Sequence, residues 1–307
     1  TLIVLMVLIH TRTYRESSSG QYLLTLLKLL LIAAFVLTAF ATGSDFSHQV
    51  TSASLLNAGE ILSGAGAIAL IYVTYAYSGW NAATYILGEL EHPKRDLPRA
   101  LIVGCALVTV LYVLLNTAFL TSASISSMTG EVEIAFIVAE TVLGESGAFI
   151  VSLLLSGVLI STVSAMIMAG PRALQRLGQD YRGLAWLGKT NEGGLPTNAI
   201  VFMGLVALGF LWTSTFEQIL LFAGLVMAAN TFFTVVAVFV SRRRRTDRPH
   251  GGSIFTMPWY PLPALIFLAI TGWTVLYTAI QYPVQLLVTA AVIALGYPYF
   301  QRIRSVQ

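Results

Sequence analysis

Residues able to bind a small polar ligand lie in the stretch 72–100, which reads YVTYAYSGWNAATYILGELEHPKRDLPRA. Tyr77, Ser78, Gly79 and Trp80 interrupt its apolar part, because glycine is a poor helix former and serine competes for backbone hydrogen bonds. An unwound turn would free backbone carbonyls and amides inside a membrane, where such groups are tolerated only if they line a cavity or meet a ligand. The pattern therefore indicates a ligand site made of backbone groups. The alternative is that Ser78 and Gly79 only let a neighbouring helix approach closely.

The composition of the chain is that of a membrane protein. Of its 307 residues, 56% are hydrophobic and only 10% are charged, whereas soluble domains carry about 25% charged residues. The single cysteine, Cys105, excludes an internal disulfide, and the four histidines lack the spacing of metal ligands. We therefore expect an integral membrane protein with no metal site, no cofactor and no nucleic-acid partner.

Apolar runs long enough to cross a bilayer, about 17 to 25 residues each, recur along the chain. They do not alternate apolar and polar residues as β-barrel strands do, so a helical bundle is expected. The run 61–87 would form a helix of about 40 Å, longer than the hydrocarbon core, which favours an interruption within it. Nine spans are predicted: a partial helix at 1–10 and the runs 23–43, 61–87, 100–120, 149–169, 199–212, 219–240, 262–280 and 284–299.

The basic residues alternate between the two sides of the predicted spans. All 17 lysines and arginines except Lys28 fall in loops on one side, and the loops on the other side have none. By the positive-inside rule, the basic loops and the C-terminus are cytoplasmic. We interpret the run Arg242–Arg245 as part of this orientation signal, with a site for lipid headgroups as the alternative.

Two stretches resemble a known transporter family. Residues 75–101, YAYSGWNAATYILGELEHPKRDLPRAL, resemble the sixth transmembrane helix and following cytoplasmic loop of permeases of the amino acid, polyamine and organocation (APC) superfamily, especially L-type exchangers and their bacterial relatives. Residues 171–199 are similar to the loop after helix eight, with Arg172, Asp180 and Pro196 at the family's spacing. The resemblance extends over nearly the whole chain.

The resemblance implies an all-α integral membrane fold, the leucine-transporter-like bundle of two inverted five-helix repeats whose discontinuous helices one and six form the site. On this alignment the chain lacks helices one to three and is truncated to about nine helices, from a partial helix four to helix twelve. Its expected divisions are 1–43 (rest of the first repeat), 60–240 (second repeat) and 260–301 (helices eleven and twelve).

The resemblance also implies a substrate site at the interruption. Backbone groups there would face the amino group of an amino acid, since carbonyl ends attract ammonium groups as amide ends attract carboxylates. Tyr75 would be an aromatic gate, Gly79 would supply backbone freedom, and Asn81 would border the pocket. The expected substrate-binding residues are Tyr75, Ala76, Tyr77, Ser78, Gly79 and Asn81.

Lys28 is the one basic residue inside a predicted span. An intramembrane charge costs roughly 2.5–3.5 kcal/mol on insertion scales, so it usually has a role or reaches the interface. One interpretation is that Lys28 snorkels to the cytoplasmic surface. The resemblance implies another: the ammonium replaces the sodium ion of sodium-coupled relatives, faces Ser161 and Thr162, and couples transport to protons. For both hydroxyls, hydrogen bonding to their own helix is the simpler alternative.

An amphipathic helix is predicted at residues 131–145, on the extracellular side. It would cap the bundle or, as the resemblance implies, form a lid over the outer vestibule. Asn116 and Asn230 are expected to form interhelical hydrogen bonds. The apolar face predicted for this helix consists of Val132, Ala135, Phe136, Ala139, Val142 and Leu143.

The function implied by the resemblance is secondary active transport of amino acids by alternating access, as a proton-coupled symporter or as an amino acid exchanger. The implied partners are an amino acid substrate, the lipid bilayer of the plasma membrane and, for the symporter, protons; an accessory subunit is left open. The alternative is a transport-inactive fragment, a sensor or an assembly subunit of a permease. An intramembrane enzyme is disfavoured, since the sequence has no membrane-embedded aspartate pair, zinc-type histidine group or G-x-S-x-G motif.

Overall fold

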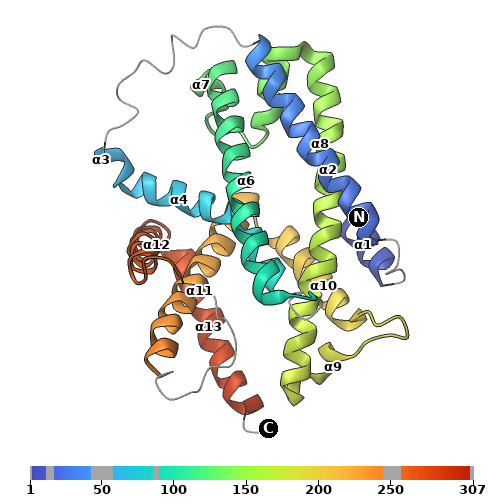
Figure 1. Cartoon of the computed structure of the whole chain (residues 1–307), viewed down its shortest axis with the longest axis vertical. Helices are drawn as coiled ribbons and strands as arrows, with labels where there is room; N and C mark the ends of the chain where they lie inside the picture. Colours follow the sequence, from blue (N-terminus) through green and yellow to red (C-terminus); the bar gives the residue numbers. More distant parts are fainter. Residues whose placement is uncertain (1, 12–16, 43–57, 86–89, 245–256, 305–307) are drawn as a thin grey trace. The chain divides into compact units, whose positions relative to one another are not determined.

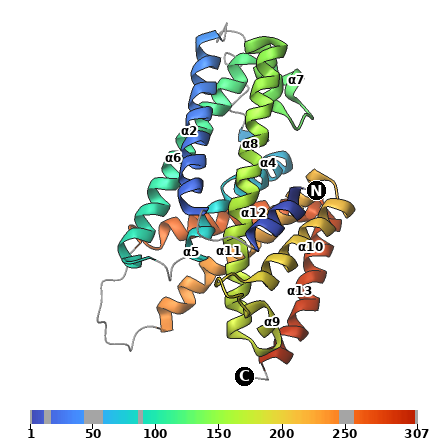
Figure 2. The ribbon, with the colours of Figure 1, turned by 90° about the vertical axis from the view of Figure 1, so that its right-hand side faces the viewer.

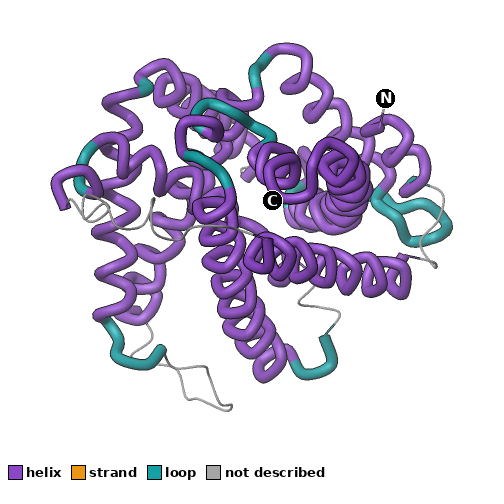
Figure 3. The backbone as a smooth tube through the Cα atoms, turned by 90° about the horizontal axis from the view of Figure 1, so that it is seen from above, coloured by secondary structure: helices purple, strands orange, loops and turns teal. Residues whose placement is uncertain are grey.

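The computed structural model describes residues 2–11, 17–42, 58–85, 90–244 and 257–304. Every regular element in these ranges is a helix, as Figure 3 shows. Six of the described helices are long and apolar enough to cross a membrane. A membrane favours helices because each backbone group is paired within the segment, away from water.

The helices follow the predicted apolar runs closely (Figure 1). The run 61–87 is the exception, because several short helices replace one long helix. The elements are α1 (Leu2–His10), α2 (Ser17–Thr42), α3 (Ala58–Ile61), α4 (Gly64–Ala76), η2 (Ser78–Asn81), α5 (Ala82–Tyr85), α6 (Pro93–Ser122), α7 (Ile125–Met128), α8 (Ile134–Asp180), η4 (Arg182–Leu184), α9 (Ala185–Gly188), α10 (Thr197–Thr213), α11 (Phe216–Arg244), α12 (Leu262–Gln281) and α13 (Pro283–Arg304).

The chain forms two compact units, each assembled from separated segments. These units are defined by which residues pack together. They do not test whether the chain contains inverted repeats, so the predicted division into repeats stays a prediction. Unit 1 comprises Thr1–Leu55, Ile102–Leu177 and Trp186–Leu205, and unit 2 comprises Leu56–Leu101, Gly178–Ala185 and Val206–Gln307.

In unit 1, α2 packs against α6 through small and branched apolar side chains. Val36 and Ala39 of α2 are buried with Ala118 of α6. The rings of Phe35 and Phe119 meet edge to face, with their centroids 5.9 Å apart. Such pairs add stability beyond the apolar area that they bury.

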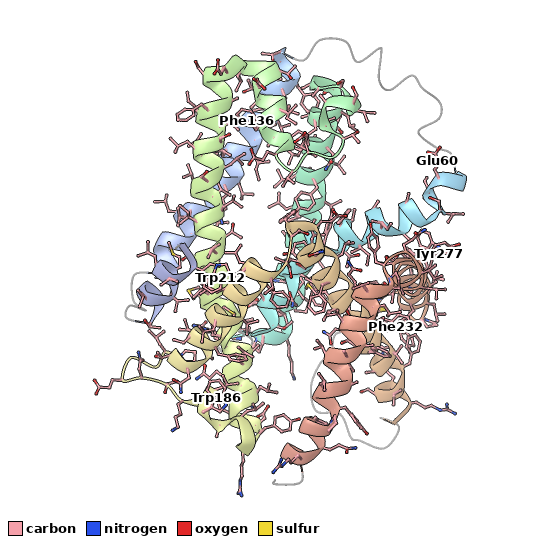
Figure 4. The ribbon with its side chains drawn as sticks, turned by 180° about the vertical axis from the view of Figure 1, so that it is seen from behind. Glu60, Phe136, Trp186, Trp212, Phe232 and Tyr277 are labelled. Atoms are coloured by element: carbon pink, nitrogen blue, oxygen red, sulfur yellow. The ribbon has the colours of Figure 1, made fainter. Side chains whose placement is uncertain are left out.

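In unit 2, α4, α11 and α12 pack together. Their shared core contains Ile71 of α4 with Leu221 and Ala228 of α11, and each of these side chains is at most 1% exposed. Phe232 of α11 and Tyr277 of α12 are labelled in Figure 4 on two helices of this unit. The discontinuous segment at 58–85 is therefore held by the C-terminal third of the chain.

The helix predicted at 131–145 is present with different limits. Helix α8 begins at Ile134, and Gly144, with φ 74° and ψ 178°, interrupts it before the transmembrane part. Ala139 is buried as predicted, but the buried residue beside it is Val138, and Val132 lies before the helix and is 70% exposed. The predicted face is thus wrong at its two ends, because Val132 precedes the helix and Leu143 is 42% exposed.

Candidate functional site

The interruption predicted near Tyr77 is present in unit 2. Helix α4 ends at Ala76, and Tyr77 follows with φ −88° and ψ 3°, its N–H donating to Val73 O over 3.0 Å. Residues 78–81 then form the 3-10 helix η2 before α5 begins at Ala82. Figure 2 labels α4 and α5 around this change. The tighter turn interrupts the α-helical series of hydrogen bonds after Ala76.

A second interruption, which the sequence analysis did not predict, separates α3 from α4. The Ser63 hydroxyl donates to Glu60 O over 2.6 Å and accepts from the N–H of Gly66 over 3.4 Å, so Ser63 caps α4. A Cβ on Gly66 would collide with the carbonyl oxygen of Ile61. Serine is a preferred N-cap residue, so Ser63 is the local sequence signal for this bend.

The expected substrate residues differ in exposure. Gly79 does not have a left-handed backbone, and a Cβ added there would meet no heavy atom within 4 Å. Neither strain nor crowding in this structure therefore requires glycine, and the binding roles of all six residues stay predictions. Tyr75, Ala76 and Gly79 are exposed, whereas Tyr77, Ser78 and Asn81 are half-buried.

In unit 1, Lys28 reaches one of the two predicted hydroxyls. Its Nζ donates to Oγ1 of Thr162 over 3.2 Å, which links the middle of α2 to α8 (Figure 1). The Thr162 hydroxyl in turn donates to Val158 O over 2.9 Å. Thr162 thus bonds to its own helix and also accepts from the lysine, so the two alternatives for this hydroxyl are both met. The coupling role of Lys28 stays a prediction.

Ser161, the other predicted hydroxyl, is 4% exposed on α8. Its Oγ has no hydrogen-bond partner among the residues that the structure describes. An unpaired buried hydroxyl costs about 1–3 kcal/mol. Ser161 and Thr162 are adjacent, and they face different surroundings.

Ser161→Ala is expected to leave the free energy of unfolding unchanged or to raise it by as much as about 1 kcal/mol, since no hydrogen bond is lost. Thermal unfolding of the purified protein in detergent would measure this. Ser156→Ala is the matched control on the same helix, because that hydroxyl donates to Ser152 O over 2.9 Å. A clear loss of stability in Ser161→Ala would show that the hydroxyl has a partner.

Comparison with known proteins decides the family of this chain. The family model described as amino acid permease matches residues 1–297. The chain belongs to the amino acid permease family. This confirms the resemblance to APC superfamily permeases and, with the six apolar helices, an all-α, multi-pass integral membrane protein.

Curated relatives of this family member are named as amino acid transporters. The chain is similar to the human b(0,+)-type amino acid transporter 1, with 26% identity over 253 residues, 78% of this chain and 50% of the relative. It is also similar to the mouse large neutral amino acids transporter small subunit 2, with 25% identity over 306 residues, 97% of this chain and 56% of the relative. The chain spans about half the length of the curated relatives it matches.

Gly224 of α11 packs beside the predicted site of this permease, and the sequence analysis missed it. A Cβ there would lie 2.7 Å from Cγ2 of Ile71 and 3.9 Å from Cβ of Tyr75. The end of α4 that leads into the interruption therefore packs directly on a glycine. The signal was available, because Gly224 and Ala228 form a small-xxx-small pair, the pattern that lets membrane helices approach.

His10 is a second residue that the sequence analysis missed. Its Nε2 lies 2.9 Å from Oγ of Ser164, and the imidazole is 9% exposed. Ser164 follows Thr162 by two residues, so α1 and α2 both make polar contacts with this part of α8. The only sequence signals are a histidine at the end of an apolar run and the polar segment STVS, which nothing local connects.

The prediction for Asn116 is wrong. Its Nδ2 donates to Tyr112 O of its own helix over 2.8 Å, since the nearest carbonyl pairs the amide without another helix. The side chain of Asn230 makes no interhelical hydrogen bond within the described residues. The same residues hold no group of three or more His, Cys, Asp or Glu side chains placed to bind a metal ion.

Proposed function

We propose that this permease carries amino acids across the membrane by alternating access, with the substrate bound at the interruption that follows α4. The observation that supports this most directly is the match of residues 1–297 to the amino acid permease family. The names of the relatives, a b(0,+)-type and a large neutral amino acid transporter, favour amino acids as the cargo.

The local geometry in unit 2 suits a zwitterion. The last carbonyls of α4 carry partial negative charge and attract an ammonium group, whereas free amides attract a carboxylate. Ser78 and Asn81 follow this helix end and are half-buried, so this part of the chain is partly shielded from bulk solvent. Tyr75 adjoins the interruption and provides an aromatic ring of the size needed to cover a bound side chain.

Lys28 favours protons over sodium as the coupling ion. Its ammonium already donates to the Thr162 hydroxyl, which could otherwise bind sodium. A sodium ion close by would be repelled strongly by the ammonium at low dielectric. A lysine can instead gain and release a proton, which is the property that a proton-coupled carrier requires. Exchange without a coupling ion is the alternative mechanism. The distribution of basic residues among the loops supports a cytoplasmic C-terminus, and the plasma membrane is the proposed location.

Uptake of a radiolabelled amino acid mixture into proteoliposomes tests the proposal, with the complete coding sequence expressed. Tyr75→Ala is expected to lower kcat/KM by at least about tenfold, which corresponds to about 1.4 kcal/mol of transition-state binding. Val73→Ala is the matched control, because Val73 lies on the same helix and is 47% exposed. Its uptake should remain close to that of the parent.

Two outcomes would contradict the proposal. A folded parent that takes up no amino acid would favour a sensor or assembly role for the protein. Equal losses in Tyr75→Ala and Val73→Ala would mean that the end of α4 acts through packing alone and does not contact substrate.

A further inference from the structure

A cluster of cationic and aromatic side chains lies between the C-terminal end of α11 and the residues that precede α12. The guanidinium carbon of Arg242 lies 3.9 Å from the centre of the Tyr260 ring. Phe239, one turn earlier on α11, lies against the same ring, with the two centroids 5.5 Å apart. Because residues three apart share a helix face, Phe239 and Arg242 together form a platform for Tyr260. We call Arg242, Trp259 and Tyr260 the headgroup cluster.

Trp259 extends this cluster outward. Its side chain is 85% exposed, the largest exposed fraction among the large hydrophobic residues of the described chain. Its backbone has φ 56°, in the left-handed region, which is unfavourable for a bulky residue. Strained backbone of this kind is typical of functional positions, where surrounding structure holds a side chain in a required direction.

The headgroup cluster lies at the ends of two helices that are long and apolar enough to cross a membrane. Helices α11 and α12 both have the length and hydropathy of membrane spans, and the cluster joins the last turn of one to the residues just before the other. Tryptophan and tyrosine concentrate at the membrane–water interface because their rings are amphipathic. The distribution of basic residues places this end of both spans in the cytoplasmic leaflet, where anionic lipids concentrate.

Stacking leaves Arg242 ready to bind an anion. The guanidinium carbon lies over the Tyr260 ring in a cation–π contact, which does not use the N–H donors of Arg242 for hydrogen bonds. Within the described part of the chain, Arg242 makes no salt bridge. Phosphate oxygens match the spacing of these donors.

We propose that the headgroup cluster binds the phosphate of an anionic phospholipid in the cytoplasmic leaflet, with Trp259 inserted beside the glycerol backbone. A lipid fits better than a soluble phosphate, because a highly exposed indole beside two membrane spans gains free energy from acyl chains and interfacial groups. This site lies apart from the interrupted helix, and the proposal does not depend on transport.

Native mass spectrometry of the purified, detergent-solubilised protein tests this proposal, with dioleoyl phosphatidylglycerol and dioleoyl phosphatidylcholine as probes. The parent is expected to bind phosphatidylglycerol at least about fivefold more tightly than phosphatidylcholine. Arg242→Gln should remove most of this preference, and Tyr260→Leu should weaken it while leaving the charge in place. Arg99→Gln is the matched control, since Arg99 is also exposed, lies on the same predicted side and makes no cation–π contact with the described residues.

Three results would overturn the proposal. One is equal affinity of the parent for the two lipids, and another is an equal loss in Arg242→Gln and Arg99→Gln, which would indicate nonspecific attraction between charges. The third is displacement of phosphatidylglycerol by inorganic phosphate, which would indicate a site for a soluble anion. Arg242→Lys keeps the charge and the helix and loses the planar fork, so an intermediate preference is expected even if Arg242→Gln folds poorly.

Discussion

Replacing Lys28 with alanine is expected to remove amino acid uptake that depends on a proton gradient while the protein remains folded. The ammonium donates to Thr162 over 3.2 Å and is the one basic group that the sequence places inside a span. Without it, α2 loses both the proposed proton carrier and its polar link to α8. We expect gradient-driven uptake to fall by at least about tenfold, equivalent to about 1.4 kcal/mol in the activation free energy. Proteoliposome uptake at two internal pH values would measure this.

Variants of Lys28 and Thr162 distinguish a role in proton coupling from a role in helix packing. Lys28→Met retains the length of the side chain without a proton, so it should reproduce the alanine phenotype. Thr162→Val should weaken gradient-driven uptake, whereas Thr38→Val should not, because Thr38 on α2 donates only to Ala34 O of its own helix. If Lys28→Ala transports like the parent under a gradient, Lys28 is a snorkelling residue and the coupling proposal is wrong.

Gly224→Val is expected to lower the stability of the protein and its uptake more than Gly209→Val does. The first added carbon would lie 2.7 Å from Cγ2 of Ile71, closer than apolar atoms approach, and 3.4 Å from the Ile71 carbonyl oxygen. Forced separation of tightly packed elements costs about 1–3 kcal/mol, and the two extra methyl groups of valine place the effect near the upper end. Thermal unfolding in detergent would report the change.

Gly209→Val is the control for the intrinsic effect of valine in a helix. A Cβ on Gly209 of α10 would meet no heavy atom within 4 Å, so this variant should unfold within about 1 kcal/mol of the parent. Equal unfolding temperatures for the two variants would show that α4 moves away from α11 without cost. The contact at Gly224 would then not hold the end of the interrupted helix.

The apolar runs predicted the helices well because a membrane leaves the backbone few other solutions. The change at Tyr77 could also be predicted. The run 61–87 is too long for one span, and Ser78 and Gly79 within it are poor helix formers. The limits of the helix near 134 could not be predicted to the residue. Its interruption depends on the positive φ of Gly144, and nothing in the apolar spacing marks that conformation.

Residues of the candidate site could be predicted only where the sequence signal is local or where the family resemblance implies the contact. Lys28 and Thr162 were brought together by resemblance, and no periodicity connects two residues 134 positions apart. His10 and Ser164 are 154 positions apart, and no family pattern was considered for them. Asn116 was misjudged because residue type shows that an amide must be paired, but not whether its partner lies in the same helix.

The assembly of unit 2 has a consequence for the order in which the protein is made. Residues 58–85 form only short helical pieces, so as this segment leaves the ribosome it lacks an uninterrupted helix to stabilise it in lipid. The side chains that bury Ile71 lie on α11 and α12, which are synthesised more than a hundred residues later. The interrupted segment therefore gains this packing only after the last third of the chain is made. Until then, chaperones or the insertion machinery would have to stabilise it.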